Sequence, residues 1–126
     1  MGEFMGNLML KRAYDTVNVT DGKRILVDRI WPRGVKKETL QLDLWAKQLA
    51  PTKALRQAFN HEPEKFSWFT EQYQKELQQN PATPEFVFTV KQWLETANVT
   101  LIYSAKDPLF NQAQVLQKFL QEQLKT

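Results

Sequence analysis

The chain has 126 residues, of which 42% are hydrophobic and 25% are charged. These values are typical of one globular domain, and they exclude a largely disordered, collagen-like or coiled-coil protein. Cysteine is absent, which excludes disulfides, thiolate nucleophiles and cysteine-bound metals, and the single histidine excludes a multi-histidine metal site.

The net charge of +3 is concentrated near the start of the chain. Residues 1–37 carry eight basic and four acidic side chains, whereas the remaining 89 residues carry nine and ten. A modest basic excess attracts anions of any kind, and by itself it is too small to indicate nucleic-acid binding.

The start of the chain reads Met1-Gly2-Glu3-Phe4, in which Glu-Phe is the dipeptide that a common cloning site encodes. We therefore interpret residues 1–7 as a cloning remnant or a disordered start, and residues 8–126 as a single α/β domain. The sequence shows neither a signal peptide nor an apolar run of the ~20 residues that a membrane span requires, so a cytoplasmic protein is expected.

Three segments have the apolar composition of buried strands, namely residues 8–14, 25–31 and 99–104. Helical spacing of apolar residues, or a helix-start signal, marks five further stretches: residues 42–49, 52–59, 63–77, 83–97 and 115–124. This order predicts an α/β fold with a small, mostly parallel, three-stranded sheet packed by about five helices. The link between the first two strands is short for a parallel crossover, so an antiparallel arrangement of the two stays open.

The second predicted strand carries two charged residues, Asp28 and Arg29, near the end of an otherwise apolar run. Because side chains alternate along a strand, these two are expected on opposite faces. An unpaired buried ion is costly, so each of them must find a partner or reach a cleft. In open α/β sheets the cleft lies beyond the carboxyl ends of the strands, where Trp31 and Arg33 also fall.

The third predicted strand delivers a second polar group to the same edge, consisting of Tyr103, Ser104, Lys106 and Asp107. The last helix begins close behind, near residues 108–111, and a helix N-terminus favours an anion. With Lys106, Arg29 and Arg33, this helix end predicts a concave positive pocket. Asp28 or Asp107 would act there as a base or orient the ligand.

A structural interpretation competes with this one. Asp28 and Asp107 would then form internal ion pairs that tie strands to helices, or Asp107 would simply cap a helix. His61 lies between two predicted helices, where an imidazole could transfer protons but more often caps or packs. The pair Lys36-Lys37 is typical of a solvated surface. Glycine-rich nucleotide loops and the G-x-S-x-G elbow are absent, so the chemistry that depends on them has no support.

Longer patterns give a family resemblance. The stretches KRAY at residues 11–14 and DGKRILVDRIWPRG at residues 21–34 resemble the leading motif of the domain of unknown function 488 family, in its YeaO-like branch. The similarity continues through residues 59–61 and VTLIYSAKD at residues 99–107, and it spans roughly residues 8–120. It implies an α/β domain, favours a parallel arrangement of the first two strands and assigns no reaction.

The polar motif residues imply a shared site. Ligand contacts are assigned to Arg12, Tyr14, Arg29, Trp31, Arg33, Tyr103, Lys106 and Asn111. Any proton transfer is assigned to Asp28, His61 and Asp107. No metal ligand is assigned and no cofactor is identified, although carboxylate-only magnesium binding stays open.

Our leading hypothesis is a protein that binds a small anionic ligand, phosphorylated or carboxylated, at the carboxyl ends of its strands. Whether it is also an enzyme stays open. The alternative is a nucleic-acid or protein-binding accessory module that uses the basic first third of the chain. A third interpretation is a dimerising structural protein whose polar motif only stabilises its fold; the sequence leaves the oligomeric state undetermined.

Overall fold

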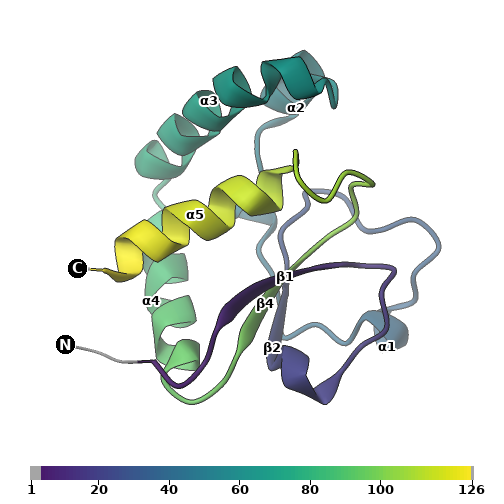
Figure 1. The fold of residues 1–126 in the computed structure, drawn as a ribbon, viewed down its shortest axis with the longest axis vertical. Coiled ribbons are helices and arrows are strands. Elements are labelled where there is room, and N and C mark those ends of the chain that lie inside the picture. Colours follow the sequence, from purple (N-terminus) through teal and green to yellow (C-terminus); the bar gives the residue numbers. More distant parts are fainter. Residues whose placement is uncertain (1–3, 126) are drawn as a thin grey trace.

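Within residues 4–125, which the computed structural model describes, four strands form one parallel sheet (Figure 1). The strands are β1 (Leu8–Arg12), β2 (Lys23–Leu26), β3 (Leu44–Trp45) and β4 (Val99–Tyr103). Their order across the sheet is β1-β4-β2-β3, so β4 pairs with a strand on each side. Every residue of β4 is buried, as expected for the central strand of a parallel sheet.

Helices make up most of the connections in this described part of the chain. The five α-helices are α1 (Lys37–Leu40), α2 (Lys53–Phe59), α3 (Phe66–Gln79), α4 (Thr83–Leu94) and α5 (Gln112–Leu124). The three short 3-10 helices are η1 (Val19–Asp21), η2 (Lys47–Leu49) and η3 (Pro63–Lys65). The predicted number of about five helices is therefore confirmed.

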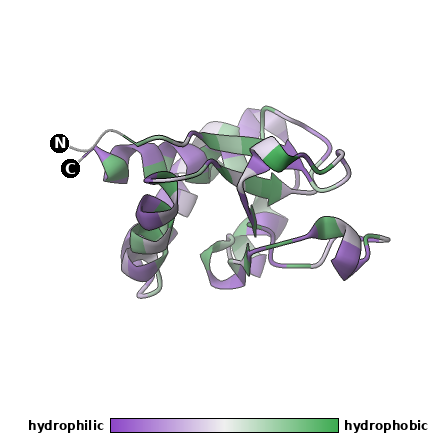
Figure 2. Ribbon diagram, turned by 90° about the horizontal axis from the view of Figure 1, so that it is seen from below, coloured by the Kyte–Doolittle hydropathy of each residue, from purple (hydrophilic) through white to green (hydrophobic). Residues whose placement is uncertain are grey.

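One face of the sheet packs against the longer helices, and α5 runs across it (Figure 1). Val99, Leu101 and Tyr103 alternate along β4 toward this face and join the main hydrophobic core with Ile25 of β2. In Figure 2 the helices mix hydrophobic and hydrophilic residues along their length. This mixture is expected of helices that bury only one side.

The opposite face is covered by the segment between β2 and β3. Leu26 and Ile102 meet Leu40 of α1 in a second, smaller core. Trp31 and Trp45 pack against this core with their ring centroids 5.4 Å apart in an edge-to-face arrangement. The chain after β2 therefore leaves the carboxyl edge of the sheet and turns back over this face.

The sheet has four strands, not the three predicted from the sequence. The additional strand is β3, whose two residues pair with Ile25 and Leu26 at the edge of the sheet. The helix predicted over residues 42–49 is wrong. Leu42 and Trp45 pack on the smaller core whereas Leu49 belongs to the main core, so their helical spacing does not reflect a shared helix face.

The second strand also ends earlier than predicted, at Leu26 instead of Trp31. The Val27 N–H still donates to the Ile102 carbonyl at 3.0 Å, but the neighbouring strand β4 then ends at Tyr103. Residues from Asp28 onward therefore leave the sheet. Asp28 and Arg29 lie in the loop beyond β2, and the expectation that they alternate on opposite strand faces is wrong.

The relation of the first two strands is now defined. β1 and β2 each pair in parallel with β4, which lies between them, so the antiparallel alternative is excluded. The short link between β1 and β2 contains the single 3-10 turn η1 and no α-helix.

The predicted helix starts are largely confirmed. The Thr52 side chain accepts the Leu55 N–H at 3.2 Å, as expected of an N-cap. Pro84 occupies the first turn of α4, which ends at Leu94, three residues before the predicted end.

The chain start is described from Phe4 onward, so residues 1–3 of the proposed cloning remnant lie outside the described residues. Gly6 N–H donates to the Leu94 carbonyl at 3.0 Å, and Asn7 N–H donates to Asn98 Oδ1 at 2.8 Å. Both contacts involve residues that come before residue 8. The domain boundary at residue 8 stays a prediction. Across residues 4–125, no helix is long and apolar enough to cross a membrane.

The turn before β2 depends on glycine. Gly22 has φ +67°, and a Cβ atom at this position would lie 2.1 Å from the Asn98 carbonyl oxygen. We expect Gly22→Ala to lower the free energy of unfolding by about 1–3 kcal/mol, because a left-handed backbone and a backbone clash both oppose it. Urea denaturation measures the loss.

Gly34 provides a matched control. It has φ +78°, but a Cβ atom at this position would meet no heavy atom within 4 Å, so Gly34→Ala tests the backbone conformation without the clash. If Gly22→Ala costs no more stability than Gly34→Ala, close packing of this turn against Asn98 is refuted.

Candidate functional site

A cleft of about 780 Å³ opens where the carboxyl ends of β2 and β4 meet α2 and α5. This volume is in the range of small-molecule sites. We call it the carboxyl-edge cleft. Its lining consists of Tyr14, Asp28, Arg29, Ile30, Trp31, Pro32, Arg33, Pro51, Arg56, Gln57, Phe59, Asn60, His61, Phe69, Ser104, Ala105, Lys106, Asp107, Asn111 and Gln112.

Asp28 is the buried acid of the cleft, with 8% of its surface exposed. Its Oδ2 accepts the Ser104 backbone N–H at 3.0 Å and also the Ser104 hydroxyl, and its Oδ1 accepts the Gln112 side-chain amide. The carboxylate thus joins the end of β4 to the first turn of α5. Burial raises the pKa of Asp28 above its ordinary value, and the hydrogen bonds and the charge of Arg56 offset this effect only in part.

Two arginines lie on the inner side of the cleft. Arg29 Nε donates to the Pro51 carbonyl at 3.2 Å and its Nη2 to the Ala50 carbonyl at 3.1 Å, so one edge of its guanidinium holds the chain before α2. Arg56 of α2 is different, because its buried Nε has no hydrogen-bond partner in the described residues. A buried N–H without an acceptor is rare and costly.

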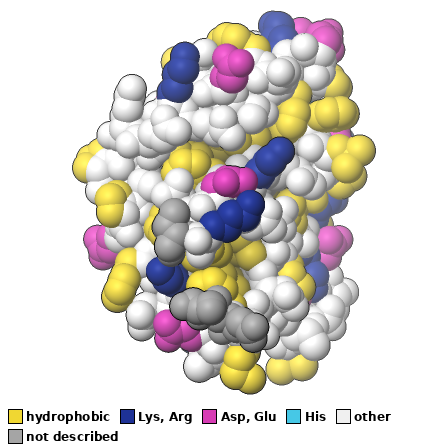
Figure 3. Space-filling view, turned by 60° about the vertical axis from the view of Figure 1, so that its left-hand side comes forward, with side chains coloured by type: hydrophobic (Ala, Val, Ile, Leu, Met, Phe, Trp, Pro, Cys, Tyr) yellow, Lys and Arg dark blue, Asp and Glu magenta, His cyan; other side chains and the backbone are white. Residues whose placement is uncertain are grey.

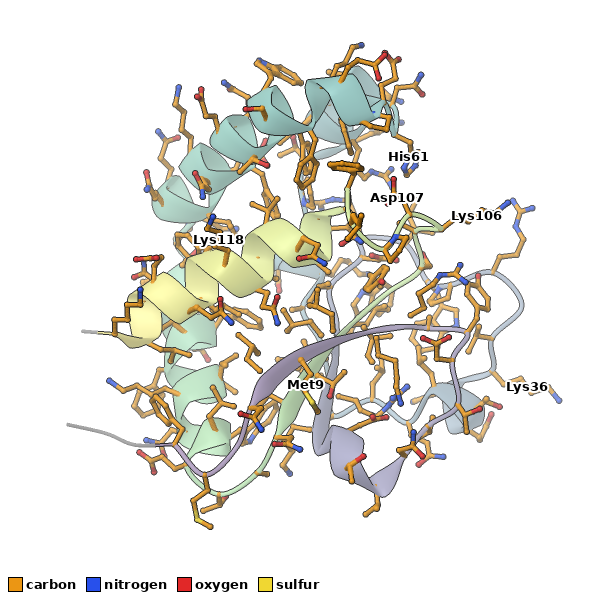
Figure 4. The ribbon with its side chains drawn as sticks, viewed as in Figure 1. Met9, Lys36, His61, Lys106, Asp107 and Lys118 are labelled. Atoms are coloured by element: carbon orange, nitrogen blue, oxygen red, sulfur yellow. The ribbon has the colours of Figure 1, made fainter. Side chains whose placement is uncertain are left out.

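The outer rim carries Arg33, His61 and Lys106, which are all exposed. His61 and Lys106 come from distant parts of the sequence, yet both line the cleft, and Figure 4 shows them with Asp107 on the same side of the molecule. Lys36 lies well apart from this group in the same view and does not line the cleft. His61 has φ +55° and follows Asn60 at φ +50°, so two consecutive left-handed residues shape this rim.

Asp107 and Asn111 organise the turn that leads into α5. Asp107 Oδ1 accepts the backbone N–H groups of Leu109 and Phe110 at 2.9 and 3.2 Å. The buried Asn111 accepts the Gln114 N–H at 3.1 Å as the N-cap of α5 and donates to the Asp107 carbonyl at 2.7 Å. Both residues line the cleft, but only Asn111 caps a helix. Asp107 closes the turn before α5, so the helix-cap role that the structural interpretation gave to Asp107 belongs to Asn111 instead.

The remaining predicted residues divide into two groups. Tyr14 and Trp31 line the cleft; the Tyr14 hydroxyl donates to the Arg33 carbonyl at 3.1 Å, and the Trp31 indole donates to the Val35 carbonyl at 2.6 Å. Arg12 and Tyr103 do not line it. Arg12 donates to the carbonyls of Ser104 and Ala105, and Tyr103 is buried in the main core. Arg12 thus supports the cleft through the backbone of two lining residues, whereas Tyr103 is part of the core.

Internal ion pairs do not account for the polar residues of the cleft. The salt bridges among residues 4–125 join Lys11 and Arg24 to Asp21, and Lys65 and Lys125 to neighbouring glutamates. Neither Asp28 nor Asp107 takes part in one. The cations of the cleft are therefore not neutralised by direct contact with its two carboxylates.

Sequence reasoning assigned no role to five polar residues of the lining: Arg56, Gln57, Asn60, Ser104 and Gln112. Ser104 was grouped with the edge but not assigned a role. Arg56 lies on a helix next to the buried Leu55, and no local pattern distinguishes it from a surface arginine. Gln112 is the first residue of α5, and only the fold brings it to Asp28.

A metal site finds no support in the described residues, since residues 4–125 contain no cluster of three or more His, Asp or Glu side chains that could hold an ion. The cleft itself offers four cations, two carboxylates, one imidazole and several neutral hydrogen-bonding groups.

The fold and the cleft define a class of protein, a small parallel α/β domain with a cationic cleft at the carboxyl ends of its strands. The chain belongs to the domain of unknown function 488 family, and it is YeaO-like. Residues 7–126 match the family model described as "Inactive DUF488-N3 subclade".

Three relatives are all described as uncharacterised. The protein YeaO of Escherichia coli (strain K12) is 42% identical over 114 residues, which cover 90% of this chain and 96% of that protein. Mb3100c of Mycobacterium bovis and Rv3073c of Mycobacterium tuberculosis are each 43% identical over 74 residues, 59% of this chain and 63% of theirs. No solved structure matches the chain.

Proposed function

We propose that this protein binds a small phosphorylated or carboxylated ligand in the carboxyl-edge cleft. One observation carries the proposal: four cationic side chains line a single cleft without an ion-pair partner in the described residues, and the buried acid beside them is held by neutral donors. The cations are Arg29, Arg33, Arg56 and Lys106. An electropositive, partly desolvated hollow attracts anions more strongly than the same charges would on an open surface.

Arg56 supplies the strongest single argument. Its Nε is buried and lacks an acceptor among residues 4–125, although it lies in the lining of the cleft. A phosphate or carboxylate oxygen would provide the acceptor that the chain itself does not provide.

The proposal concerns binding without turnover. The description of the subclade as inactive supports this restriction. If the protein does catalyse a reaction, the candidates for proton transfer are still Asp28, His61 and Asp107. A cytoplasmic location likewise stays a prediction.

The alternative, a nucleic-acid or protein-binding module, has less support. Lys11 and Arg24 of the basic first third are engaged by Asp21, and Arg12 is engaged by two carbonyls. On the face over the two chain ends, which Figure 3 shows, basic and acidic side chains are interspersed and form no continuous basic band; this view does not extend to the other faces. The first third of the chain therefore offers fewer free cations than its composition indicates.

The experiment compares two charge-removing double variants. Arg33→Gln with Lys106→Gln removes two exposed cations of the cleft, and Lys36→Gln with Lys37→Gln removes two exposed cations outside it. Wild-type protein is first screened by thermal shift against phosphate, sugar phosphates, nucleotides and small carboxylates, and hits are titrated calorimetrically. We expect the cleft variant to bind about tenfold or more weakly and the control to bind like wild type.

Two outcomes would count against the proposal. If no anion stabilises the wild-type protein, the proposed site does not exist. If both double variants lose the same amount of binding affinity, overall charge attracts the ligand and the cleft does not. Oligonucleotide binding that depends on Lys36 and Lys37 and weakens steeply with salt would favour the alternative module.

A further inference from the structure

The buried acid of the cleft has unused hydrogen-bonding capacity. An ionised carboxylate offers about four acceptor positions. The Ser104 backbone N–H and hydroxyl occupy two of them on Oδ2, and the Gln112 amide occupies one on Oδ1. One acceptor position on Oδ1 of Asp28 is left without a partner in residues 4–125, in a side chain that is 8% exposed and lines the cleft.

We propose that the natural ligand is a polyol phosphate, a phosphate ester whose hydroxyl groups lie close to the phosphate. The phosphate contacts the cationic side of the cleft and a ligand hydroxyl donates to Asp28. This inference rests on the proposed function and specifies its ligand.

The charges of the cleft favour phosphate over a single carboxylate. Arg33, Arg56 and Lys106 are free of ion pairs in the described residues, and several cations match a phosphate ester that carries close to two negative charges better than a carboxylate that carries one. Arg56 contributes a buried N–H that already lacks an acceptor.

Asp28 explains why the ligand needs more than a phosphate. A carboxylate inside an anion site repels a plain anion, so its presence weakens phosphate binding unless it contacts a donor. A hydroxyl group provides that donor without adding charge. An ammonium group would also donate, but the surplus of cations around Asp28 disfavours it. Gln112 adds to the match, because its amide oxygen can accept a second hydroxyl while its nitrogen contacts Asp28.

The test compares two phosphate esters with the same carbon skeleton. Glycerol 3-phosphate carries two hydroxyl groups that propyl phosphate lacks. In calorimetric titrations of the full chain, we expect glycerol 3-phosphate to bind roughly tenfold to hundredfold more tightly, as expected for a hydrogen bond to a buried charged acceptor. Glycerol without the phosphate should show no measurable binding.

Asp28→Asn is the matched variant. It keeps the shape of the side chain and replaces one acceptor oxygen by a donor, so the preference for glycerol 3-phosphate should fall to within about threefold. Propyl phosphate should bind Asp28→Asn at least as well as wild type, because a negative charge has been removed. Circular dichroism verifies that the variant folds.

Each result has a distinct meaning. If wild-type protein binds both esters equally, the polyol inference is overturned while the anion site stands. If neither ester nor any other anion binds, the proposed function itself fails. An Asp28→Asn variant that keeps the full preference assigns the hydroxyl contact to another residue and also overturns the inference. The wild-type comparison needs no variant, so misfolding of Asp28→Asn leaves the inference tested.

Discussion

Asp21→Ala is expected to lower the free energy of unfolding by about 3–5 kcal/mol, because it leaves a buried arginine without its counter-ion. Arg24 is 3% exposed, and its Nη1 donates to Asp21 at 2.6 Å. Lys11 Nζ donates to the other carboxylate oxygen at 2.8 Å. The buried carboxylate of Asp21 thus forms ion pairs with two cations.

After the Asp21→Ala substitution, the Arg24 side chain cannot easily move into solvent. Its Nε donates to the Leu40 carbonyl at 2.9 Å, and its buried Nη2 already has no partner in the described residues. Equilibrium urea denaturation measures the loss. Glu122→Ala, which removes an exposed surface pair with Lys125, is the control and should change stability by less than about 0.5 kcal/mol.

A second variant shows whether the unpaired charge is the cause. Adding Arg24→Met to Asp21→Ala removes the buried cation and should restore much of the lost stability, since a packed apolar side chain often replaces a buried ion pair at little cost. A double variant that is less stable than Asp21→Ala would contradict this explanation and point to packing of the arginine stem instead.

The same residue predicts a dependence on pH. Burial alone would raise the pKa of Asp21, but hydrogen bonds from Lys11, the Asn18 backbone and Arg24, together with the charge of Lys11, lower it overall. A lowered folded-state pKa stabilises the fold above the unfolded value, and this contribution is lost as the pH falls through the folded value. Wild-type stability should therefore decrease in acid more steeply than that of Asp21→Asn, as measured by urea midpoints from about pH 6 down to pH 3.

Much of the fold could be predicted because its signals are local. The apolar run of β4, the N-cap at Thr52 and the first-turn proline Pro84 depend on residues within one or two turns of the chain. β3 could not be predicted, because a two-residue strand carries no periodic pattern and exists only through its pairing with β2. The early end of β2 also depends on strand pairing, since its ladder with β4 ends at the pair of Leu26 and Ile102.

The residues of the candidate site could likewise be predicted only in part. Charges at the ends of apolar runs predicted the position of Asp28, Arg29 and Lys106, because parallel strands bring their carboxyl ends to one edge. Arg56 could not be assigned, because α2 is placed at the cleft by tertiary contacts, its packing against α3 and the bonds of Arg29 to the chain before it. Arg12 carries the same charge as the site residues, and only its bonds to two carbonyls show that it supports the cleft from outside.

Asp28→Ala is expected to lower the free energy of unfolding by about 2–4 kcal/mol. The substitution leaves the Ser104 N–H and hydroxyl and the Gln112 amide without their acceptor, and it separates the end of β4 from the start of α5. Asp28→Asn should cost less, because the amide keeps one acceptor oxygen. Urea denaturation of both variants at neutral pH measures the difference.

The pH dependence of this loss has the opposite sign to that of Asp21. Because burial raises the folded-state pKa of Asp28, its stabilising contribution is fully present below the unfolded value and is lost as the pH rises through the folded value. Asp28→Asn lacks this titration, so its deficit relative to wild type should be largest in acid and shrink toward neutral pH. Urea midpoints of the two proteins between about pH 4 and pH 8 test the sign. A deficit that grows with pH would mean that the ionised carboxylate, through Arg56 and its neutral donors, stabilises the fold more than burial opposes it.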